Sequence, residues 1–417
     1  MKQKSALHLF DGYGIEIEYM IVGAESLEVM PISDELLRML SGSRTGQYPN
    51  DARVKDISVA NEIVLHVAEL CNADPVPAIG PLAGSFQLAV ERLNSLLSSA
   101  GARLMPTAMH PWMDPAAEAR IWPHEYSTVY NTYDRIFNCR RHGWANVQST
   151  QLNISFSGDD EFGSLHAACR FLLPMLPALA ASSPVVEGRA TGFMDSRLAH
   201  YRANQRVVPS VSGQVIPEPV YTEGSYRDAI LEKMYCDMAA HDPEGVLRYE
   251  WLNSRGAIPR FDRSAIEIRV ADSQECPVAD MAIAEAIAMV LRAICSGKWL
   301  DPSAVAAWPT ERLIPILDST IKNGEEAVID DRAYLEGLGL KAGSAPASKV
   351  WQHLADKVCA DVVTDTGKKN PLEAIFENGT LARRILKALG GHADKDRLKR
   401  VYSQLCGCLA EGRVFLP

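Results

Sequence analysis

Polar side chains recur at alternate positions in several segments of the chain, with the spacing of β-strands that have one polar face. In the first such segment, Glu16 and Glu18 flank the apolar Ile17. Neighbours on the same face of a strand lie about 7 Å apart, which allows each carboxylate to bind one ion of a metal cluster. The alternative is an amphipathic strand whose acidic face is simply hydrated.

A second apolar segment is interrupted by Glu62, His66 and Glu69. Glutamate is seldom buried without a partner, so the two carboxylates indicate a polar environment. Because they are seven residues apart, they lie on opposite faces of a regular strand. Both can serve one site only if the strand contains a bulge or if Glu62 lies in a loop. An isolated histidine such as His66 is more often a hydrogen-bonded structural residue than a ligand.

Two later segments add amide and basic groups. Gln151 and Asn153 share one strand face. Amide oxygens can complete a Mg²⁺ shell or bind a substrate, although exposed strands also carry such residues. Glu267 and Arg269 share a face in the last segment. They form either a same-strand ion pair or a metal ligand beside an arginine that stabilises a transferring phosphoryl group.

The order of strands and helices indicates the fold class. The predicted strands are Gly14–Val22, Glu62–Cys71, Val147–Phe156 and Ala265–Val270, and the predicted helices among them are Ser85–Ala100, Gly163–Ala181 and Val278–Ile294. These segments lack the regular strand-helix repeat of a parallel sheet, so the sequence favours an α+β fold with an antiparallel sheet.

The remainder of the chain is expected to be mostly helical. Helical patterns cover Ser303–Asn323, Ala347–Val363, Leu372–Leu389 and Asp394–Glu411. We therefore predict a catalytic domain at residues 1–298 and a helical C-terminal region at 299–417, which either packs into the same domain or stands apart from it.

Composition excludes several classes of partner. The net charge of −10 disfavours nucleic acid and anionic membrane surfaces. No stretch has the roughly 18 uninterrupted apolar residues that span a bilayer, and the first ten residues lack the apolar core of a secretory signal, so a cytoplasmic location is expected. The nine cysteines, which include the Cys406 and Cys408 pair, favour inert thiols over disulfides or a zinc site. A homo-oligomer is compatible with the sequence.

Taken in order, these polar segments resemble the glutamate-cysteine ligase family of the glutamine synthetase-like superfamily. Ala108-Met-His-Pro-Trp is similar to that family's small-x-His-Pro-aromatic segment. Ala181-Ser-Ser-Pro, followed by Gly188-Arg-Ala-Thr-Gly-Phe and Ser196-Arg197, resembles its substrate-side loop. The likeness spans about residues 10–295 and implies a curved antiparallel sheet flanked by helices.

The resemblance also implies metal ligands. It assigns Glu18, Glu62 and Glu69 to one Mg²⁺ or Mn²⁺ ion, and it assigns Glu16 and Glu267 to a second. Many family members have a histidine where this chain has Gln151 followed by Asn153, as the plant-type branch does. Gln151 is therefore expected to be a ligand of the second metal, and Asn153 is expected to contact a substrate.

Two arginines receive roles by the same resemblance. Arg269 is expected to bind the γ-phosphate of ATP. Arg197 is expected to bind the α-carboxylate of the amino-acid substrate, with Arg189, Arg202 and Arg206 as alternatives. The chain has no Walker A sequence, so the nucleotide is expected to bind through the sheet and the metals.

The expected activity is an ATP-dependent ligation of a carboxylate to an amine. ATP first converts the carboxylate to an acyl phosphate, because a carboxylate does not condense with an amine at neutral pH. The resemblance implies L-glutamate and L-cysteine as substrates, a step of glutathione biosynthesis. The alternatives are a related ligase with another acid or amine and an inactive binding protein that retains the fold.

Overall fold

The computed structural model describes residues 7–358 and 370–417. Its centre is an eight-stranded sheet of order β2-β3-β4-β1-β6-β10-β9, in which β5 also pairs with β1 and all pairings are antiparallel. These strands are β1 Tyr13–Gly23, β2 Asp51–Val54, β3 Ile57–Asn61, β4 Val67–Asn72, β5 Ala102–Met105, β6 Ser149–Ser155, β9 Ala257–Arg260 and β10 Ala265–Asp272. The predicted α+β fold with an antiparallel sheet is confirmed.

Among the residues that the structure describes, two small hairpins lie outside this sheet, and helices form the rest of the regular structure. The hairpins pair β7 Val185–Val186 with β8 Arg189–Ala190, and β11 Val328–Ile329 with β12 Ala345–Pro346. The first helices are α1 Ser33–Ser41, α2 Leu82–Leu97, α3 Pro115–Glu118, α4 Ser127–Phe137, α5 His142–Ala145, α6 Gly158–Leu172, α7 Pro177–Ala180, α8 Ser196–Tyr201, α9 Glu223–Tyr226 and α10 Lys233–Met238. They are followed by α11 Pro277–Cys295, α12 Pro302–Ala306, α13 Thr310–Asn323, α14 Arg332–Gly337, α15 Ala347–Val358, α16 Pro371–Asn378, α17 Leu381–Leu389 and α18 Lys395–Glu411.

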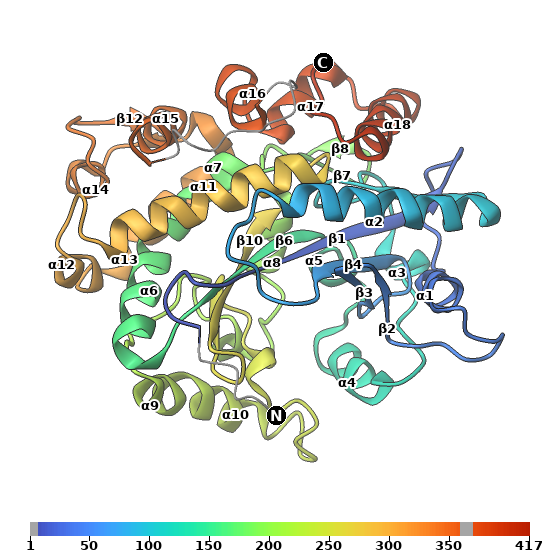
Figure 1. Ribbon diagram of the computed structural model, residues 1–417, viewed down its shortest axis with the longest axis horizontal. Helices are drawn as coiled ribbons and strands as arrows, with labels where there is room; N and C mark the ends of the chain where they lie inside the picture. The colour runs from blue at the N-terminus through green and yellow to red at the C-terminus, as the bar shows by residue number, and fades with distance from the viewer. Residues whose placement is uncertain (1–6, 359–369) are drawn as a thin grey trace.

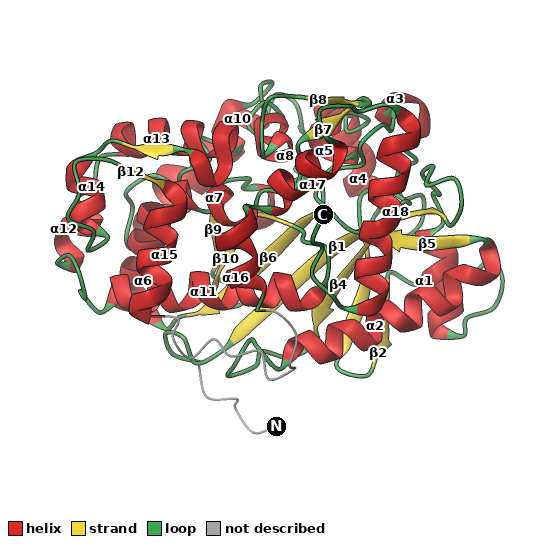
Figure 2. Ribbon diagram, turned by 90° about the horizontal axis from the view of Figure 1, so that it is seen from above, coloured by secondary structure: helices red, strands yellow, loops and turns green. Residues whose placement is uncertain are grey.

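Helices cover one face of the sheet in two layers. The long helices α2 and α11 pack against each other, with α2 against β5 and α11 against β6 (Figure 1). Beyond them lie the C-terminal helices, where α15 and α16 contact α11, and α18 contacts α2 and β5 (Figure 2). Within the described residues, no helix has the length and apolar character needed to cross a membrane.

The alternation of β1 divides the sheet into an apolar and a polar face. Ile15, Ile17 and Tyr19 are fully buried, in one apolar cluster with Phe86 of α2 and Ile287 of α11. Burying these side chains under the helices contributes about 1.5–3 kcal/mol for each large apolar group. The intervening residues of β1 must therefore point to the face opposite these two helical layers.

Several predicted helices are interrupted where proline or glycine stops them. Leu372–Leu389 was expected to be one helix, but α16 and α17 are separated at Gly379, whose φ of +86° is not helical. Gly163–Ala181 is likewise divided, because Pro174 and Pro177 begin a 3₁₀ turn and α7. Pro309 separates α12 from α13 within Ser303–Asn323.

Other helix predictions hold. The helices expected at Ser85–Ala100, Val278–Ile294 and Asp394–Glu411 correspond to α2, α11 and α18 within a few residues. The expected helix Ala347–Val363 matches α15 as far as Val358, and its remainder lies outside the described residues. Asp394 itself is the cap of α18, where its side chain accepts the N–H of Arg397.

Candidate active site

The central strand β1 carries two glutamates to the polar face. Glu18 lies opposite Glu69 of β4, and Glu16 lies opposite Gln151 of β6. The predicted strand Glu62–Cys71 is only partly a strand, because Glu62 lies in the loop between β3 and β4. Of the two arrangements that would let Glu62 and Glu69 share one site, a bulge or a loop position for Glu62, the structure has the second. Ligand oxygens of Glu18, Glu62 and Glu69 consequently lie within 4.8 Å of one another.

Burial makes this acidic cluster costly unless a cation is present. Burial, followed by the charge of Glu62, raises the pKa of Glu18 to about 8. Burial also raises the pKa of Glu62, and it raises that of Glu69 well above its ordinary value. A divalent ion would stabilise all three carboxylates in their charged form. The all-oxygen donor set is of the type that Mg²⁺ and Mn²⁺ prefer, so these residues fit the metal that was predicted.

A second acidic group surrounds Glu16. Asn153 Nδ2 donates to Glu16 Oε1 at 2.9 Å, and Glu267 of β10 lies opposite Asn153. Burial, followed by the charge of Glu267, raises the pKa of Glu16 to about 7. Burial opposes ionisation of Glu267 as well, but the guanidinium groups of Arg269 and Arg260 lower its pKa. Glu16 and Glu267 are therefore neighbours on the polar face.

Gln151 lies between the two acidic groups but does not present its oxygen to either. Its Nε2 donates to Glu18 Oε1 at 3.1 Å and is 3.4 Å from Ser149 Oγ. In this orientation the amide nitrogen faces the acidic cluster. Metal ligation by Gln151 would require the amide to turn over, so that its oxygen replaces the nitrogen.

Arg269 stands beside Glu267, as the strand alternation predicts. Its Nε donates to Glu267 Oε1 at 2.9 Å, and its Nη2 contacts the same oxygen. Although burial opposes it, the charge of Glu267 raises the pKa of Arg269 well above its ordinary value. The side chain remains 22% exposed. A permanently charged guanidinium therefore faces the open side of the sheet.

Arg197 lies in the first turn of α8 and contacts β10. It is only 3% exposed, and its Nε pairs with Asp272 Oδ1 at 2.5 Å. Nη1 donates to the carbonyl of Arg269 at 3.3 Å, whereas Nη2 is buried and has no hydrogen-bond partner among the described residues. The three alternative arginines, Arg189, Arg202 and Arg206, do not line the cavity that Arg197 lines.

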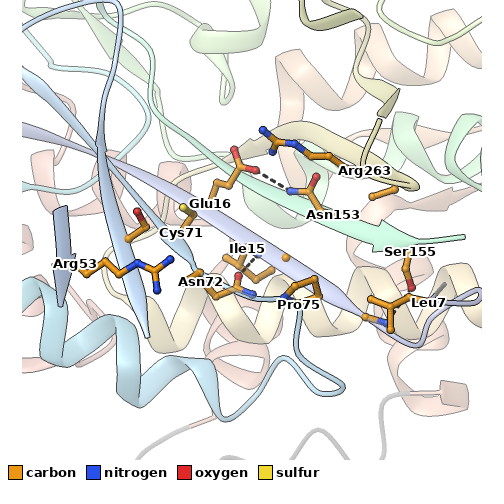
Figure 3. Close-up of a pocket in the computed structure, with 15 residues that line it drawn as sticks. Leu7, Ile15, Glu16, Arg53, Cys71, Asn72, Pro75, Asn153, Ser155 and Arg263 are labelled. Atoms are coloured by element: carbon orange, nitrogen blue, oxygen red, sulfur yellow. Dashed lines mark hydrogen bonds between the residues drawn. The ribbon is translucent and has the colours of Figure 1, made fainter. Parts of the chain in front are cut away.

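Two cavities extend along the polar face. The inner cavity has a volume of about 220 Å³, and its lining includes Glu18, Glu62, Gln151, Arg197, Arg269, Tyr130, Tyr133, Trp144 and Trp251. The outer cavity has a volume of about 450 Å³, and its lining includes Glu16, Asn153, Arg53, Cys71 and Arg263 (Figure 3). Because Glu16 and Glu18 are alternate residues of β1, the carboxylates lie where one cavity gives way to the other.

Sequence reasoning missed the aromatic wall of the inner cavity. Tyr130 and Tyr133 are three residues apart on α4, a spacing that places them on one helix face. That signal was available but is equally typical of a buried helix face. Trp144 and Trp251 come from distant loops and short helices, and nothing in their sequence neighbourhood indicated that they meet. Asp272 was missed for the same reason.

The histidine and cysteines singled out in the sequence have structural surroundings. His66 is buried, its Nε2 lies 2.7 Å from the carbonyl of Ala145, and burial lowers its pKa to about 4. The structural interpretation of His66 is therefore the correct one. Cys406 and Cys408 are buried in α18, and burial raises their pKa values to about 12 and about 11. The described cysteines form no disulfide.

An antiparallel sheet that gathers glutamates and an arginine between two cavities is the arrangement expected of an ATP-dependent carboxylate-amine ligase. The chain belongs to glutamate-cysteine ligase family 2, whose profile matches residues 13–403. It is thus an ATP-dependent ligase that forms a C–N bond. The match extends beyond residues 10–295 and includes most of the C-terminal helices, which the sequence resemblance did not cover.

Relatives agree with this family. A protein of Archaeoglobus fulgidus without a characterised function is 36% identical over 334 residues, 79% of this chain and 88% of the relative. A protein of Nocardioides sp., provisionally named glutamate–cysteine ligase 2-1, is 25% identical over 309 residues, 72% of each chain.

Solved structures share the fold. The glutamate–cysteine ligase of Francisella tularensis, in complex with AMP, has a TM-score of 0.55 at 13% identity, with 96% of this chain and 89% of that chain covered. A bifunctional glutathione synthetase of Pasteurella multocida also has a TM-score of 0.55, at 14% identity, and this chain spans only 52% of its length.

Proposed function

We propose that the protein joins the γ-carboxylate of L-glutamate to the amino group of L-cysteine, with conversion of ATP to ADP and phosphate. The observation that carries this proposal is the position of the acidic cluster and Arg269 between the two cavities. Phosphoryl transfer to a carboxylate brings several negative charges together, so it needs fixed positive charge at that point.

The outer cavity is assigned to ATP. Its volume of about 450 Å³ lies in the range of about 300–1,000 Å³ typical of small-molecule sites. Arg53 and Arg263 line it from different elements (Figure 3), and their guanidinium groups would contact phosphate oxygens. Asn153 holds Glu16 at the inner end of this cavity. The triphosphate would then point toward Glu18 and Arg269.

Divalent ions would neutralise the phosphate charge, one held by Glu18, Glu62 and Glu69 and the other by Glu16 and Glu267, with Gln151 after its amide has turned. The guanidinium of Arg269 would stabilise the negative charge of the transferring phosphoryl group while it remains in contact with Glu267. Asn153 is assigned to nucleotide or substrate contact through its amide.

The inner cavity is assigned to the amino acids. Arg197 offers its free Nη2 to the α-carboxylate of glutamate, and Asp272 fixes the guanidinium from behind. The γ-carboxylate oxygen then attacks the γ-phosphorus of ATP, the bond to the bridging oxygen breaks, and ADP leaves. The amine attacks the acyl carbon, phosphate leaves, and the new amide nitrogen loses a proton. Walls of Tyr and Trp keep water away from the acyl phosphate.

Family membership supports glutamate and cysteine as the pair. The aromatic wall of Tyr130, Tyr133, Trp144 and Trp251 does not by itself select a thiol side chain. A related ligase with another amine is therefore the alternative that an assay has to separate. Family membership favours both ligases over an inactive binding protein.

The test supplies ATP and Mg²⁺ with a panel of acids and amines, and measures ADP release together with the mass of the product. We expect ADP release over many turnovers only when glutamate and cysteine are both present, together with a product of the mass of γ-glutamylcysteine. An amide formed from a different pair would overturn the substrate assignment and leave the class intact. Absence of ADP release with every pair would support the inactive binding protein.

A further inference from the structure

The segment that runs from the last residue of β10 toward α11, called the connector below, is both polar and completely buried. Asp272, Ser273, Gln274 and Glu275 are each at most 1% exposed. Four consecutive buried polar side chains are costly unless their polar groups are bonded. Gln274 bonds to Asp280 and to the carbonyl of Ala180. The other three residues connect the candidate active site with the C-terminal helical region.

On one side the connector holds two elements of the active site. Asp272 Oδ1 pairs with Arg197 Nε, and its Oδ2 accepts the Ser183 hydroxyl at 2.8 Å. Ser273 Oγ donates to the backbone carbonyl of Glu18 at 3.2 Å. The connector therefore contacts the arginine assigned to glutamate and the strand that carries the acidic cluster.

On the other side the connector is fixed by the C-terminal region. Glu275 forms an ion pair with Arg384 of α17, and the two side chains are 0% and 1% exposed. Phe415 joins them through its backbone, because its N–H donates to Glu275 Oε1 at 3.1 Å and its carbonyl accepts from Arg384 Nη1 at 2.6 Å. Both ribbon views place the C-terminus beside α17 (Figures 1 and 2).

We infer that Glu275 and Arg384 are positioning residues for the acid substrate, which they serve by fixing the connector whose Asp272 orients Arg197. A buried ion pair contributes little net stability, because desolvation offsets its attraction. It does fix orientation, since each partner accepts only a narrow range of geometries. The C-terminal helices would thus be part of the amino-acid site, although no described residue of theirs lines the inner cavity. This inference rests on the proposed role of Arg197.

The test is the double variant Glu275→Gln with Arg384→Met, which removes both buried charges. Glutamine keeps an acceptor for the Phe415 N–H, so the variant is expected to fold. We expect the KM for L-glutamate, and its dissociation constant measured by calorimetry, to rise about ten-fold or more. The KM for ATP should stay within two-fold of the wild type. A purely structural role would lower the melting temperature without separating the two KM values.

A matched control lies next to Arg384 on the same helix. Arg383 pairs with Glu325 and Glu326 and does not contact the connector, so Arg383→Met should leave the KM for L-glutamate unchanged. The single variant Arg384→Lys keeps the charge but cannot bond Glu275 and Phe415 in the same fork geometry. Its KM should fall between those of the wild type and the double variant, and it serves as the test if the double variant does not fold.

Three results would overturn the inference: an unchanged KM for L-glutamate in the folded double variant, a wild-type KM in Arg384→Lys if only that variant folds, or an equal rise in Arg383→Met. Failure of the proposed function is recognised separately, because the wild-type protein itself would then neither bind L-glutamate nor release ADP in its presence.

Discussion

Replacing Arg269 with lysine separates a catalytic arginine from a structural one. Two nitrogens of the guanidinium contact a single oxygen of Glu267, so the group can turn one edge to Glu267 and another to a phosphate. Lysine keeps the charge and the ion pair but has one nitrogen and no planar fork. The phosphate in transfer therefore loses at least one charge-assisted hydrogen bond. Loss of such a donor costs about 2–4 kcal/mol, equivalent to a fall in kcat of about 30- to 1,000-fold.

The assay for Arg269→Lys is a single-turnover measurement of ADP formation with saturating ATP, glutamate and Mg²⁺, together with thermal unfolding. We expect ATP binding and melting temperature close to those of the wild type, and a much slower phosphoryl transfer. A structural ion pair predicts the reverse, with a shifted melting temperature and kcat within a few-fold. Near-normal chemistry in the lysine variant would refute the catalytic role.

Further perturbations probe substrate binding, the metals and the fold. Arg197→Ala should raise the KM for glutamate far more than that for ATP, and an unchanged KM for glutamate in steady-state assays would contradict its assignment. Glu18→Gln, like exhaustive chelation, should abolish turnover. In the absence of metal, Glu18→Gln should also be more stable than the wild type near pH 8. The pKa of Glu18 is raised to about 8 in the folded protein, so ionisation of this carboxyl lowers the stability of the wild type as pH rises, and glutamine cannot ionise. Thermal unfolding in EDTA at pH 5.5 and 8 tests this, and equal pH dependence of both proteins would count against it. Burial lowers the pKa of His110 to about 4 from 6.5, and its Nδ1 accepts the N–H groups of Trp112 and Met113. Because the folded protein disfavours the charged imidazole, neutral His110 contributes fully to the free energy of unfolding above pH 6.5. As the pH falls to 4, that free energy decreases by about 3 kcal/mol. Urea unfolding of wild type and His110→Asn at pH 7 and 4.5 should show that difference, and parallel pH dependence would argue against it.

Sequence reasoning located the strands of the site because their pattern is simple. Alternation around Glu16, Glu18, Glu267 and Arg269 has a period of two, and one face of the sheet is buried while the other is polar. The assignment of side chains to these two faces follows from the local sequence alone and does not require knowledge of the tertiary structure. For Glu62, the seven-residue spacing to Glu69 left two possibilities, a bulged strand or a loop position, and the structure shows that Glu62 lies in a loop.

The rest depends on contacts between distant segments. Arg384 lies in a helical segment whose sequence gives no indication of its partner, yet it is buried in an ion pair with Glu275. Arg197 and Asp272 are far apart in the sequence, and neither neighbourhood indicates that they pair. Local propensity also favoured one long helix over α16 and α17, where Gly379 stops the first of them. Such features are determined by packing and are absent from any local pattern.

The register of β1 limits how this family can change in length during evolution. The strand is bordered on both sides by β4 and β6, so its neighbours cannot follow a shift. One residue inserted before Glu16 within the strand would turn Glu16 and Glu18 toward the helices and Ile17 toward the cavities. Insertions and deletions should therefore be confined to the loops. When homologous sequences are aligned, a gap inside this strand should therefore be moved to a flanking loop unless a β-bulge accommodates it.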